Sequence, residues 1–311
     1  MRSEDLSNFV VVAESRSLLA ASRQLGISQP TLSKSIARLE RALGAPVVQR
    51  LARGVALTEA GRAFLAHSRP VALGLQDGID AVRDLRQGRA GTVRMGLGVG
   101  VPQALIMGAC RSLLSATRVS VEITGGMSDT LAKSVGSGQC DFAVISVPPQ
   151  DLSSMQWDPL FHDPMVPIAS SSHPLAKERM VDWEKLSRQI WVVPGVGTPV
   201  RTWFERQFAT RCIKPPEQLI SMRDYFVTPE FGAALGAISL MPVSFIHVHP
   251  EARQYRVLKT PSDWKSERVV GILCRRAGYM SPAANRLIDC IIDCGEYCFR
   301  STEAQEPAQR R

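Results

Sequence analysis

Five polar side chains between residues 29 and 38 have the chemistry that recognition of a nucleic acid requires. They are Gln29, Thr31, Ser33, Lys34 and Arg38. Amide, hydroxyl and cationic groups can bond base edges and phosphates, and the N-terminal end of a helix enters a major groove first. We therefore expect Gln29, Ser33 and Lys34 to contact bases or nearby phosphates, and Arg38 to contact the backbone. For any single residue, the alternative is an ordinary solvent-exposed helix face.

Three short amphipathic helices would position these side chains, because apolar residues recur in steps of three and four. The three apolar stripes are Leu6, Phe9, Val10 and Ala13, then Leu18, Ala21 and Leu25, then Leu32, Ile36, Leu39 and Leu43. Gly26 would close the second helix in the left-handed conformation, Ser28 would cap the third, and Pro30 falls in its first turn. The pattern predicts a helix-turn-helix whose third helix is the recognition element.

The same stretch resembles the N-terminal winged helix-turn-helix of the LysR-type transcriptional regulators. The residues that carry the resemblance are Leu6, Phe9, Ala20-Ala21, Leu25, Ser28-Gln29-Pro30, Ser33, Leu39-Glu40, Leu43-Gly44, Arg50 and Leu57-Thr58-x-Ala60-Gly61. The resemblance implies a two-stranded wing over residues 47–57, with Arg50 and Arg53 facing phosphate or the minor groove. Val47-Val48 departs from the family, which usually has an apolar residue followed by Phe. The full expected DNA-binding set is Ser28, Gln29, Pro30, Thr31, Ser33, Lys34, Arg38, Arg50 and Arg53.

Charge and composition agree with a DNA-binding protein. The chain has 311 residues, 45% of them hydrophobic, and a net charge of +8. Residues 1–62 hold nine Arg or Lys and five Asp or Glu, an excess of +4 that suits a polyanion. No apolar run approaches the length of a membrane span, and the N-terminus enters the helical pattern without the apolar segment of a signal peptide. We expect a soluble, cytoplasmic protein without a membrane partner.

A long polar helix is predicted over residues 59–87, capped by Thr58. At ~1.5 Å per residue it would be roughly 44 Å long, enough for a dimer to place two recognition helices about 34 Å apart, in successive major grooves. Its seam comprises Leu65, Ser68, Ala72, Leu75, Ile79 and Val82. Such a seam requires a partner helix, so we expect a homodimer. Pro70 predicts a kink, and residues 87–91 a hinge.

After residue 91 the pattern alternates between strands and helices, which is typical of an α/β fold with parallel sheets. Expected strands cover residues 93–97, 119–123, 141–146, 165–169, 189–193, 218–222, 238–241 and 268–274. Expected helices cover residues 103–116, 128–136, 200–211, 225–235 and 282–299. The LysR resemblance implies a periplasmic-binding-protein-like domain of two lobes, with lobe one at 91–163 and 268–300 and lobe two at 164–267. The crossing strands would lie near 164–168 and 266–269.

The expected domains are therefore a winged helix-turn-helix at 1–58, a dimerising linker helix and hinge at 59–90, a two-lobed effector domain at 91–300 and an unstructured tail at 301–311. Ligands of open α/β sheets bind beyond the carboxyl ends of the strands, near helix N-termini. The expected effector contacts are Val99, Gly100, Val101, Ser128, Thr198 and Met222. Ser128 and Thr198 could serve either as helix caps or as ligand contacts. The first loop lacks a hydroxyl, which suggests an apolar wall.

The sequence gives weaker support to three other kinds of site. The glycines of Gly96-Leu97-Gly98-Val99-Gly100 do not complete a dinucleotide-binding loop, because Val101 takes the third position. His247 and His249 lack a third metal ligand. Cys290, Cys294 and Cys298 share one helix face and could form a thiolate metal site or redox sensor, or simply cover that face as small apolar residues.

We therefore expect a sequence-specific transcriptional regulator, not an enzyme, with no cofactor or metal and an unidentified small-molecule effector. Expected partners are double-stranded DNA, the effector and copies of the chain, as a dimer or, as the LysR resemblance implies, a tetramer. RNA polymerase is a further candidate partner. The alternative is a ligand-binding module that its DNA-binding domain merely tethers to DNA.

Overall fold

The computed structural model describes residues 1–15, 17–51, 54–87, 91–222, 229–248, 252–264 and 266–303. Its contacts divide the chain into two compact units. Unit 1 comprises Met1–Gly88 with Ala277–Ser281, and unit 2 comprises Arg89–Arg276 with Pro282–Arg311. Each unit has its own core.

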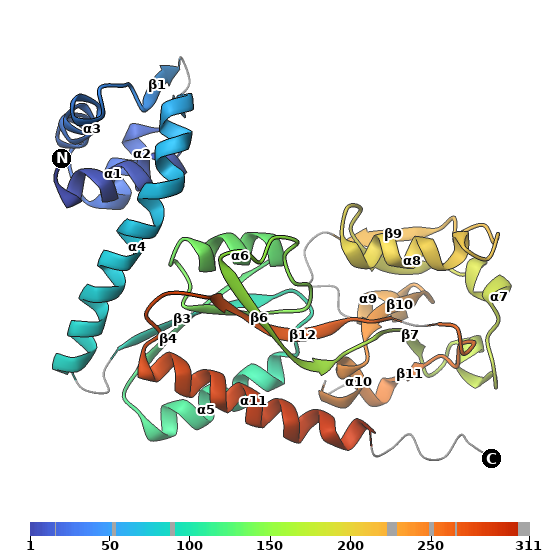
Figure 1. Ribbon diagram of the computed structural model, residues 1–311. Helices are drawn as coiled ribbons and strands as arrows, with labels where there is room; N and C mark the ends of the chain where they lie inside the picture. Colours follow the sequence, from blue (N-terminus) through green and yellow to red (C-terminus); the bar gives the residue numbers. More distant parts are fainter. Residues whose placement is uncertain are drawn as a thin grey trace. The chain divides into compact units, whose positions relative to one another are not determined.

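Unit 1 is a helix-turn-helix followed by a two-stranded wing and a long helix (Figure 1). Its elements are α1 (Ser3–Glu14), α2 (Leu18–Leu25), α3 (Gln29–Leu43), β1 (Val48–Leu51), β2 (Gly54–Leu57) and α4 (Glu59–Gln87). Phe9, Leu32 and Leu39 are completely buried in its core, so the apolar stripes of α1 and α3 face each other. The expected helices and wing are confirmed.

The turn between α2 and α3 follows the capping chemistry of the sequence. Gly26 ends α2 in the left-handed conformation with φ of 65°, and Pro30 lies in the first turn of α3. The Ser28 hydroxyl accepts a hydrogen bond from the Thr31 amide at 3.3 Å. These local interactions fix where the third helix begins, and they confirm the predicted N-cap.

The wing is joined to α4 through Thr58 and Gly61. The Thr58 hydroxyl donates to the Pro46 carbonyl at 2.6 Å and accepts from the Gly61 amide at 2.9 Å. A Cβ atom at Gly61 would lie 2.0 Å from the Val47 carbonyl oxygen, so only glycine fits this approach. Val47 is fully buried at the same junction, where the sequence departs from the family pattern.

Unit 2 contains two five-stranded sheets, ordered β4-β3-β5-β12-β6 and β11-β7-β10-β8-β9. The first sheet is made of β3 (Thr92–Gly98), β4 (Ser120–Gly126), β5 (Phe142–Ile145), β6 (Met155–His162) and β12 (Val269–Arg275). The second is made of β7 (Met165–Ser170), β8 (Trp191–Pro194), β9 (Leu219–Met222), β10 (Ile238–Pro242) and β11 (Tyr255–Val257).

The expected parallel pairing is found in part of each sheet, where β3 pairs with β4 and β5, and β8 pairs with β9 and β10. Strand β12 pairs antiparallel with β5 and β6, and β7 pairs antiparallel with β10 and β11. In each sheet, the reversed strand is the one with which the chain enters from the other sheet. Strand β7 follows the first crossing and β12 follows the second. Strands β6 and β11 were not predicted.

Helices cover the sheets on both faces. They are α5 (Gln103–Ala116), α6 (Ser128–Gly136), α7 (Trp183–Ser187), α8 (Pro199–Ala209), α9 (Pro229–Ala234), α10 (Ser244–Val248) and α11 (Pro282–Glu303), with 3-10 turns at Pro174–Lys177 and Ala252–Gln254. Figure 1 shows α5 and α11 side by side under the first sheet and α6 on its other face. The core of the second sheet includes Trp191, Phe204 and Phe208, all fully buried.

The chain crosses between the two lobes at residues 163–164 and again between β11 and β12. The first crossing lies just before the expected 164–168, because β7 already begins at Met165. The expectation of an unstructured tail from Ser301 is wrong at its start, since α11 continues to Glu303. Residues 304–311, like residues 88–90 of the expected hinge, lie outside the described residues. None of the helices described is long and apolar enough to cross a membrane.

Candidate functional sites

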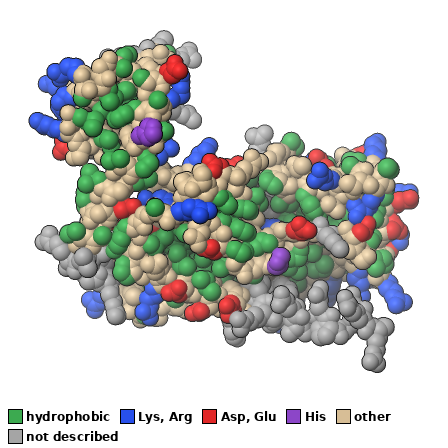
Figure 2. Space-filling view, in the orientation of Figure 1, with side chains coloured by type: hydrophobic (Ala, Val, Ile, Leu, Met, Phe, Trp, Pro, Cys, Tyr) green, Lys and Arg blue, Asp and Glu red, His purple; other side chains and the backbone are tan. Residues whose placement is uncertain are grey.

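The outer face of α3 carries the polar side chains that the sequence singled out. Gln29, Thr31 and Lys34 are exposed, and Ser33 is half-buried. Figure 2 shows Lys and Arg side chains gathered over the part of unit 1 where α3 lies. Ser28 and Pro30 are exposed as well, but the Ser28 oxygen bonds the Thr31 amide and hydroxyl, so its first role is to hold the start of the helix.

Arg38 has a structural partner that the sequence did not reveal. Its Nη2 donates to Asp5 Oδ1 at 2.6 Å and its Nε to Oδ2 at 3.3 Å, while Ser35 donates to the same carboxylate at 2.7 Å. Asp5 is completely buried, and the Arg38 side chain is 37% exposed. Two of the donors that we had assigned to the DNA backbone are therefore used to tie α1 to α3.

The pKa of Asp5 reflects this environment. Burial alone would raise the pKa, but hydrogen bonds from Arg38, Ser35 and the Arg2 amide lower it from 3.8 to about 2. The carboxylate is thus ionised over the whole range in which proteins normally operate, and the ion pair persists there.

The two wing arginines are placed only in part. Arg50 belongs to β1, whose partner in the antiparallel register is Val55, but its side chain lies outside the described residues. Arg53, which falls between β1 and β2 in the sequence, also lies outside the described residues. Their contacts with DNA stay predictions.

In unit 2, a cavity of about 80 Å³ lies between the carboxyl ends of strands from both sheets. Four of the expected effector contacts line it: Val99, Ser128, Thr198 and Met222. Val99 and Ser128 belong to lobe one, and Thr198 and Met222 to lobe two. Val99 and Met222 are more than 120 positions apart in the chain, and the structure brings them to one cavity. The cavity lies where parallel strands end, as ligand sites of α/β sheets do.

The two expected hydroxyls differ in what they are free to do. Thr198 caps α8, because its hydroxyl accepts from the Arg201 amide at 3.2 Å and donates to the Gly195 carbonyl at 2.9 Å. Ser128 is not a cap: Met127 occupies the N-cap of α6 without a side-chain hydrogen bond. The Ser128 hydroxyl is thus available to a ligand, together with the open amides of the first turn.

Gly100 and Val101, also expected as effector contacts, do not line the cavity. Val101 is buried in the protein core, with 6% of its surface exposed. Gly100 turns with φ of 76° and offers its carbonyl to Arg268, whose Nη2 donates at 2.7 Å. The apolar wall that we expected from this loop is formed by Val99 alone.

Arg268 and Asp163 form a buried ion pair where the two lobes are joined. Nη1 of Arg268 donates to Asp163 Oδ2 at 2.5 Å and to its carbonyl at 3.2 Å. The Asp163 carboxylate also accepts from the amide and hydroxyl of Ser244, both at 2.9 Å. Asp163 is completely buried and the Arg268 side chain is 6% exposed. The pair connects both crossing segments with α10 and with the Gly100 loop.

Arg201 is a second buried arginine that sequence reasoning missed. It donates from Nε to Glu205 at 2.7 Å and from Nη1 to the Ser221 hydroxyl at 3.3 Å. Its side chain is 8% exposed. By joining the first turn of α8 to β9, it fixes the position of Thr198 relative to Met222.

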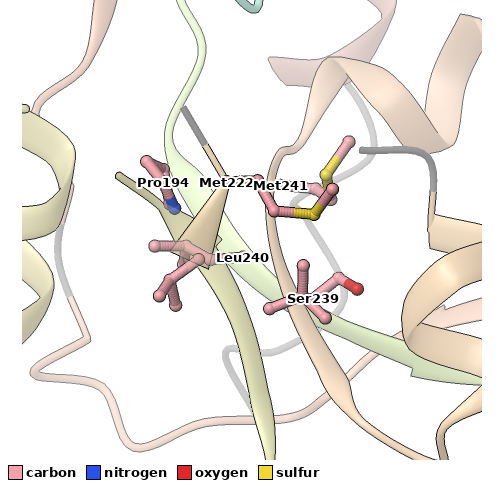
Figure 3. A pocket seen from close by; sticks show the side chains of 7 residues that line it. Pro194, Met222, Ser239, Leu240 and Met241 are labelled. Atoms are coloured by element: carbon pink, nitrogen blue, oxygen red, sulfur yellow. The ribbon is translucent and has the colours of Figure 1, made fainter. Parts of the chain in front are cut away.

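Met222 also faces a small hollow of about 10 Å³ at the ends of β8, β9 and β10. Figure 3 shows Met222 beside Met241, with Pro194 and Leu240 near them and Ser239 below. Thioether side chains adapt easily to different neighbours, so this end of the second sheet can adjust to a ligand.

The cysteine stripe of α11 packs against α5. A Cβ atom on Gly108 of α5 would lie 3.4 Å from the Cys294 sulfur. Burial raises the pKa of Cys290, and burial together with the neighbouring Cys290 raises that of Cys110. A raised pKa disfavours the thiolate that metal binding or redox chemistry needs. We therefore favour the interpretation of these cysteines as small apolar residues that cover a helix face. The side chain of Cys298, like His249, lies outside the described residues.

Comparison with known proteins identifies both units. Residues 3–62 match the family model described as "Bacterial regulatory helix-turn-helix protein, lysR family", and residues 86–294 match "LysR substrate binding domain". BudR, an HTH-type transcriptional regulator of Raoultella terrigena, is 32% identical over 82% of this chain and 91% of its own. The RuBisCO operon transcriptional regulator of Allochromatium vinosum is 26% identical over 89% of this chain and 90% of its own.

Solved structures share the fold. Full-length OxyR from Pseudomonas aeruginosa, as a point variant, matches with a TM-score of 0.68 and 20% identity, covering 96% of this chain and 95% of its own. Full-length CbnR in complex with its target DNA matches with a TM-score of 0.52 and 18% identity, covering 95% and 100%. With both family models matched in sequence over the two units described above, the chain belongs to the LysR family: it is a DNA-binding transcriptional regulator with an effector-binding domain.

Proposed function

We propose that α3 reads DNA through Gln29, Ser33 and Lys34, with phosphate contacts from the wing arginines Arg50 and Arg53. The exposure of Gln29 at the first position of α3 supports this assignment, because the N-terminal end of a recognition helix is the part that meets base edges. Ser28, Pro30 and Thr31 shape that end, and Arg38 acts first through Asp5. As a chromosomal regulator, the protein would act in the cytoplasm.

Two protein variants, compared on operator and random DNA, test this division of roles. Gln29→Ala should weaken binding to the operator by about 1–3 kcal/mol and leave binding to random DNA unchanged, since a lost base contact removes discrimination. Arg53→Ala should weaken both alike and reduce the salt slope by about 0.9, because it removes one phosphate contact. Fluorescence anisotropy on an operator selected from a random pool measures both. Equal losses for Gln29→Ala on the two DNAs would remove it from the base-reading set.

We propose that the chain dimerises through α4. Ser68 is buried within unit 1, and Leu65 packs against its core, so the first part of the expected seam is already used. Further along the same helix, Val71, Leu75, Ile79 and Val82 are 61, 46, 47 and 57% exposed. A partner helix covering this stripe would bury surface that water otherwise meets. Pairing of dimers into a tetramer and contact with RNA polymerase are further expectations for the assembled regulator.

We propose that a small molecule binds the 80 Å³ cavity and changes DNA binding. The observation that carries this proposal is the convergence of Val99 and Ser128 from lobe one with Thr198 and Met222 from lobe two on one hollow. A ligand there contacts both lobes at once, so its binding energy can favour one lobe arrangement over another.

A thermal-shift screen over small acids, amino acids and aromatic metabolites should yield a compound that raises the melting temperature. A hit that keeps its effect in the Ser128→Ala, Thr198→Val double variant would discard this cavity. If no compound has an effect on the protein and DNA binding is intact, the tethered-module interpretation is favoured instead.

A further inference from the structure

A second, larger cavity of about 360 Å³ adjoins the effector cavity. The two share Ser146, Val147, Pro199, Val200 and Arg268 in their walls, so they lie side by side. A volume of 80 Å³ holds only a few water molecules, whereas small-molecule sites usually measure roughly 300–1,000 Å³. The larger cavity therefore supplies the space that most of an effector would need.

Two tryptophans, one from each lobe, line the larger cavity. Trp157 lies on β6 of lobe one and Trp203 on α8 of lobe two, and both are half-buried. Trp203 is held edge-on against Trp264 with ring centroids 5.5 Å apart. The Trp157 ring lies over Gly271, where a Cβ atom would come within 2.6 Å of it. Each indole is thus fixed by the protein on one side and borders the cavity on the other.

The Trp157 indole carries a buried polar atom that the fold does not satisfy. Its Nε1 has no hydrogen-bond acceptor among the described residues and no contact with solvent. A buried donor without a partner is unfavourable, and buried polar groups in proteins are nearly always bonded. Because water does not reach this atom, the indole can meet a ligand in the cavity through its ring and not through its N–H.

The charges in the wall favour an uncharged occupant. Among the described lining residues of the larger cavity, only Glu267 and Arg268 are charged. The Arg268 charge is neutralised by Asp163 and its donors bond Asp163 and Gly100, while Glu267 is exposed to solvent. An anionic ring would therefore meet no available cation in this wall, and most of the remaining lining is apolar.

We propose that the larger cavity is an aromatic subsite of the effector site. It takes the flat, uncharged aromatic body of the effector against the rings of Trp157 and Trp203, while the polar end of the ligand reaches Ser128. This inference rests on the proposed effector function. Because the two indoles belong to different lobes, an aromatic ligand that contacts both joins the lobes, which an equally sized polar molecule would do poorly.

Quinoline is a suitable probe, because it is a flat bicyclic aromatic that is uncharged at neutral pH. In ligand-observed NMR with the full-length protein, quinoline should bind, and naphthoate, an anion of similar size, should bind at least tenfold more weakly. Trp157→Leu and Trp203→Leu should each weaken quinoline binding roughly tenfold. Phe231→Ala, which removes an exposed aromatic of lobe two that lines neither cavity, is the matched control and should leave binding unchanged.

Trp203 touches the core of the second sheet, so its variant could lose stability for reasons unrelated to the ligand. Val269→Phe provides a second variant, since Val269 lines only the larger cavity and a larger side chain fills that cavity without removing an indole. It should abolish quinoline binding at an unchanged melting temperature. Wild-type affinity in both Val269→Phe and Trp157→Leu, or no quinoline binding to the wild type, would overturn the aromatic subsite.

Operator binding and the thermal shift by the screened effector are measured on the same samples. A protein that binds quinoline through the tryptophans but binds no DNA fails the proposed function and keeps the subsite. A protein whose effector response is intact in Trp157→Leu and Val269→Phe keeps the proposed function and fails the subsite.

Discussion

Replacing Arg268 by Met should lower the unfolding free energy of unit 2 strongly, although Arg268 lies outside every helix and strand. The change removes the cation but leaves the Asp163 carboxylate completely buried, bonded only by the amide and hydroxyl of Ser244. Removing one partner of a buried ion pair costs about 3–5 kcal/mol. Ser244→Ala removes a single hydrogen bond to the same carboxylate and should cost about 2 kcal/mol.

Urea unfolding followed by tryptophan fluorescence measures these losses directly. All five tryptophans belong to unit 2, so the signal does not mix the two units. Arg188→Met is the matched control, since Arg188 and Glu184 form a surface pair with side chains 76 and 73% exposed, and it should have no measurable effect.

A double variant measures how much of each loss comes from leaving the other charge of the ion pair buried and unpaired. Asp163→Asn with Arg268→Met removes both charges, so its loss should be smaller than the sum of the two single losses. A loss below about 1 kcal/mol for Arg268→Met, with an unchanged urea slope, would show that this ion pair does not hold the crossing between the lobes.

Three further predictions concern unit 1. Asp5→Asn should lower its unfolding free energy by roughly 2 kcal/mol near neutral pH, because the folded-state pKa of Asp5 is about 2 and its ordinary value is 3.8. That stability is fully present above pH 3.8 and is lost as pH falls through about 2, so acid titrations of the variant and wild type by circular dichroism should converge there. Ser28→Ala should cost about 1 kcal/mol by the same assay, and Ser28→Asp, which keeps a capping oxygen, should restore it. Ile79→Glu should shift the sedimentation coefficient from dimer to monomer, whereas Asp80→Asn, a change beside the stripe, should not; a dimeric Ile79→Glu protein would argue against pairing through α4.

The recognition unit could be predicted from the sequence almost in full, because its determinants are local. Gly26, Ser28 and Pro30 act within one or two turns of their own positions, and Thr58 caps the helix that follows it. Such interactions leave a pattern in a short window. The Asp5–Arg38 pair left none, since the two residues are 33 positions apart and each is ordinary in its own helix.

In unit 2, the features that the sequence does not predict depend on contacts between residues far apart in the chain. Strand β6 alternates between apolar and polar residues only up to Asp158, and Pro159 then interrupts the pattern, yet the strand pairs along β12. The Asp163–Arg268 pair joins residues 105 positions apart. General rules for α/β sheets located Val99, Ser128, Thr198 and Met222, because strand ends and helix N-termini are local features. Trp157 and Trp203 line a cavity only through the arrangement of the two lobes, which no local pattern encodes.

We propose that the ligand cavity in unit 2 is coupled to DNA binding by the recognition helix of unit 1. The most direct test measures operator affinity with and without the effector found by the thermal-shift screen, and effector affinity with and without the operator. Both affinities should change by the same factor, because binding at two coupled sites is reciprocal. Operator and effector affinities that are unchanged by each other, with both ligands bound at once, would contradict it.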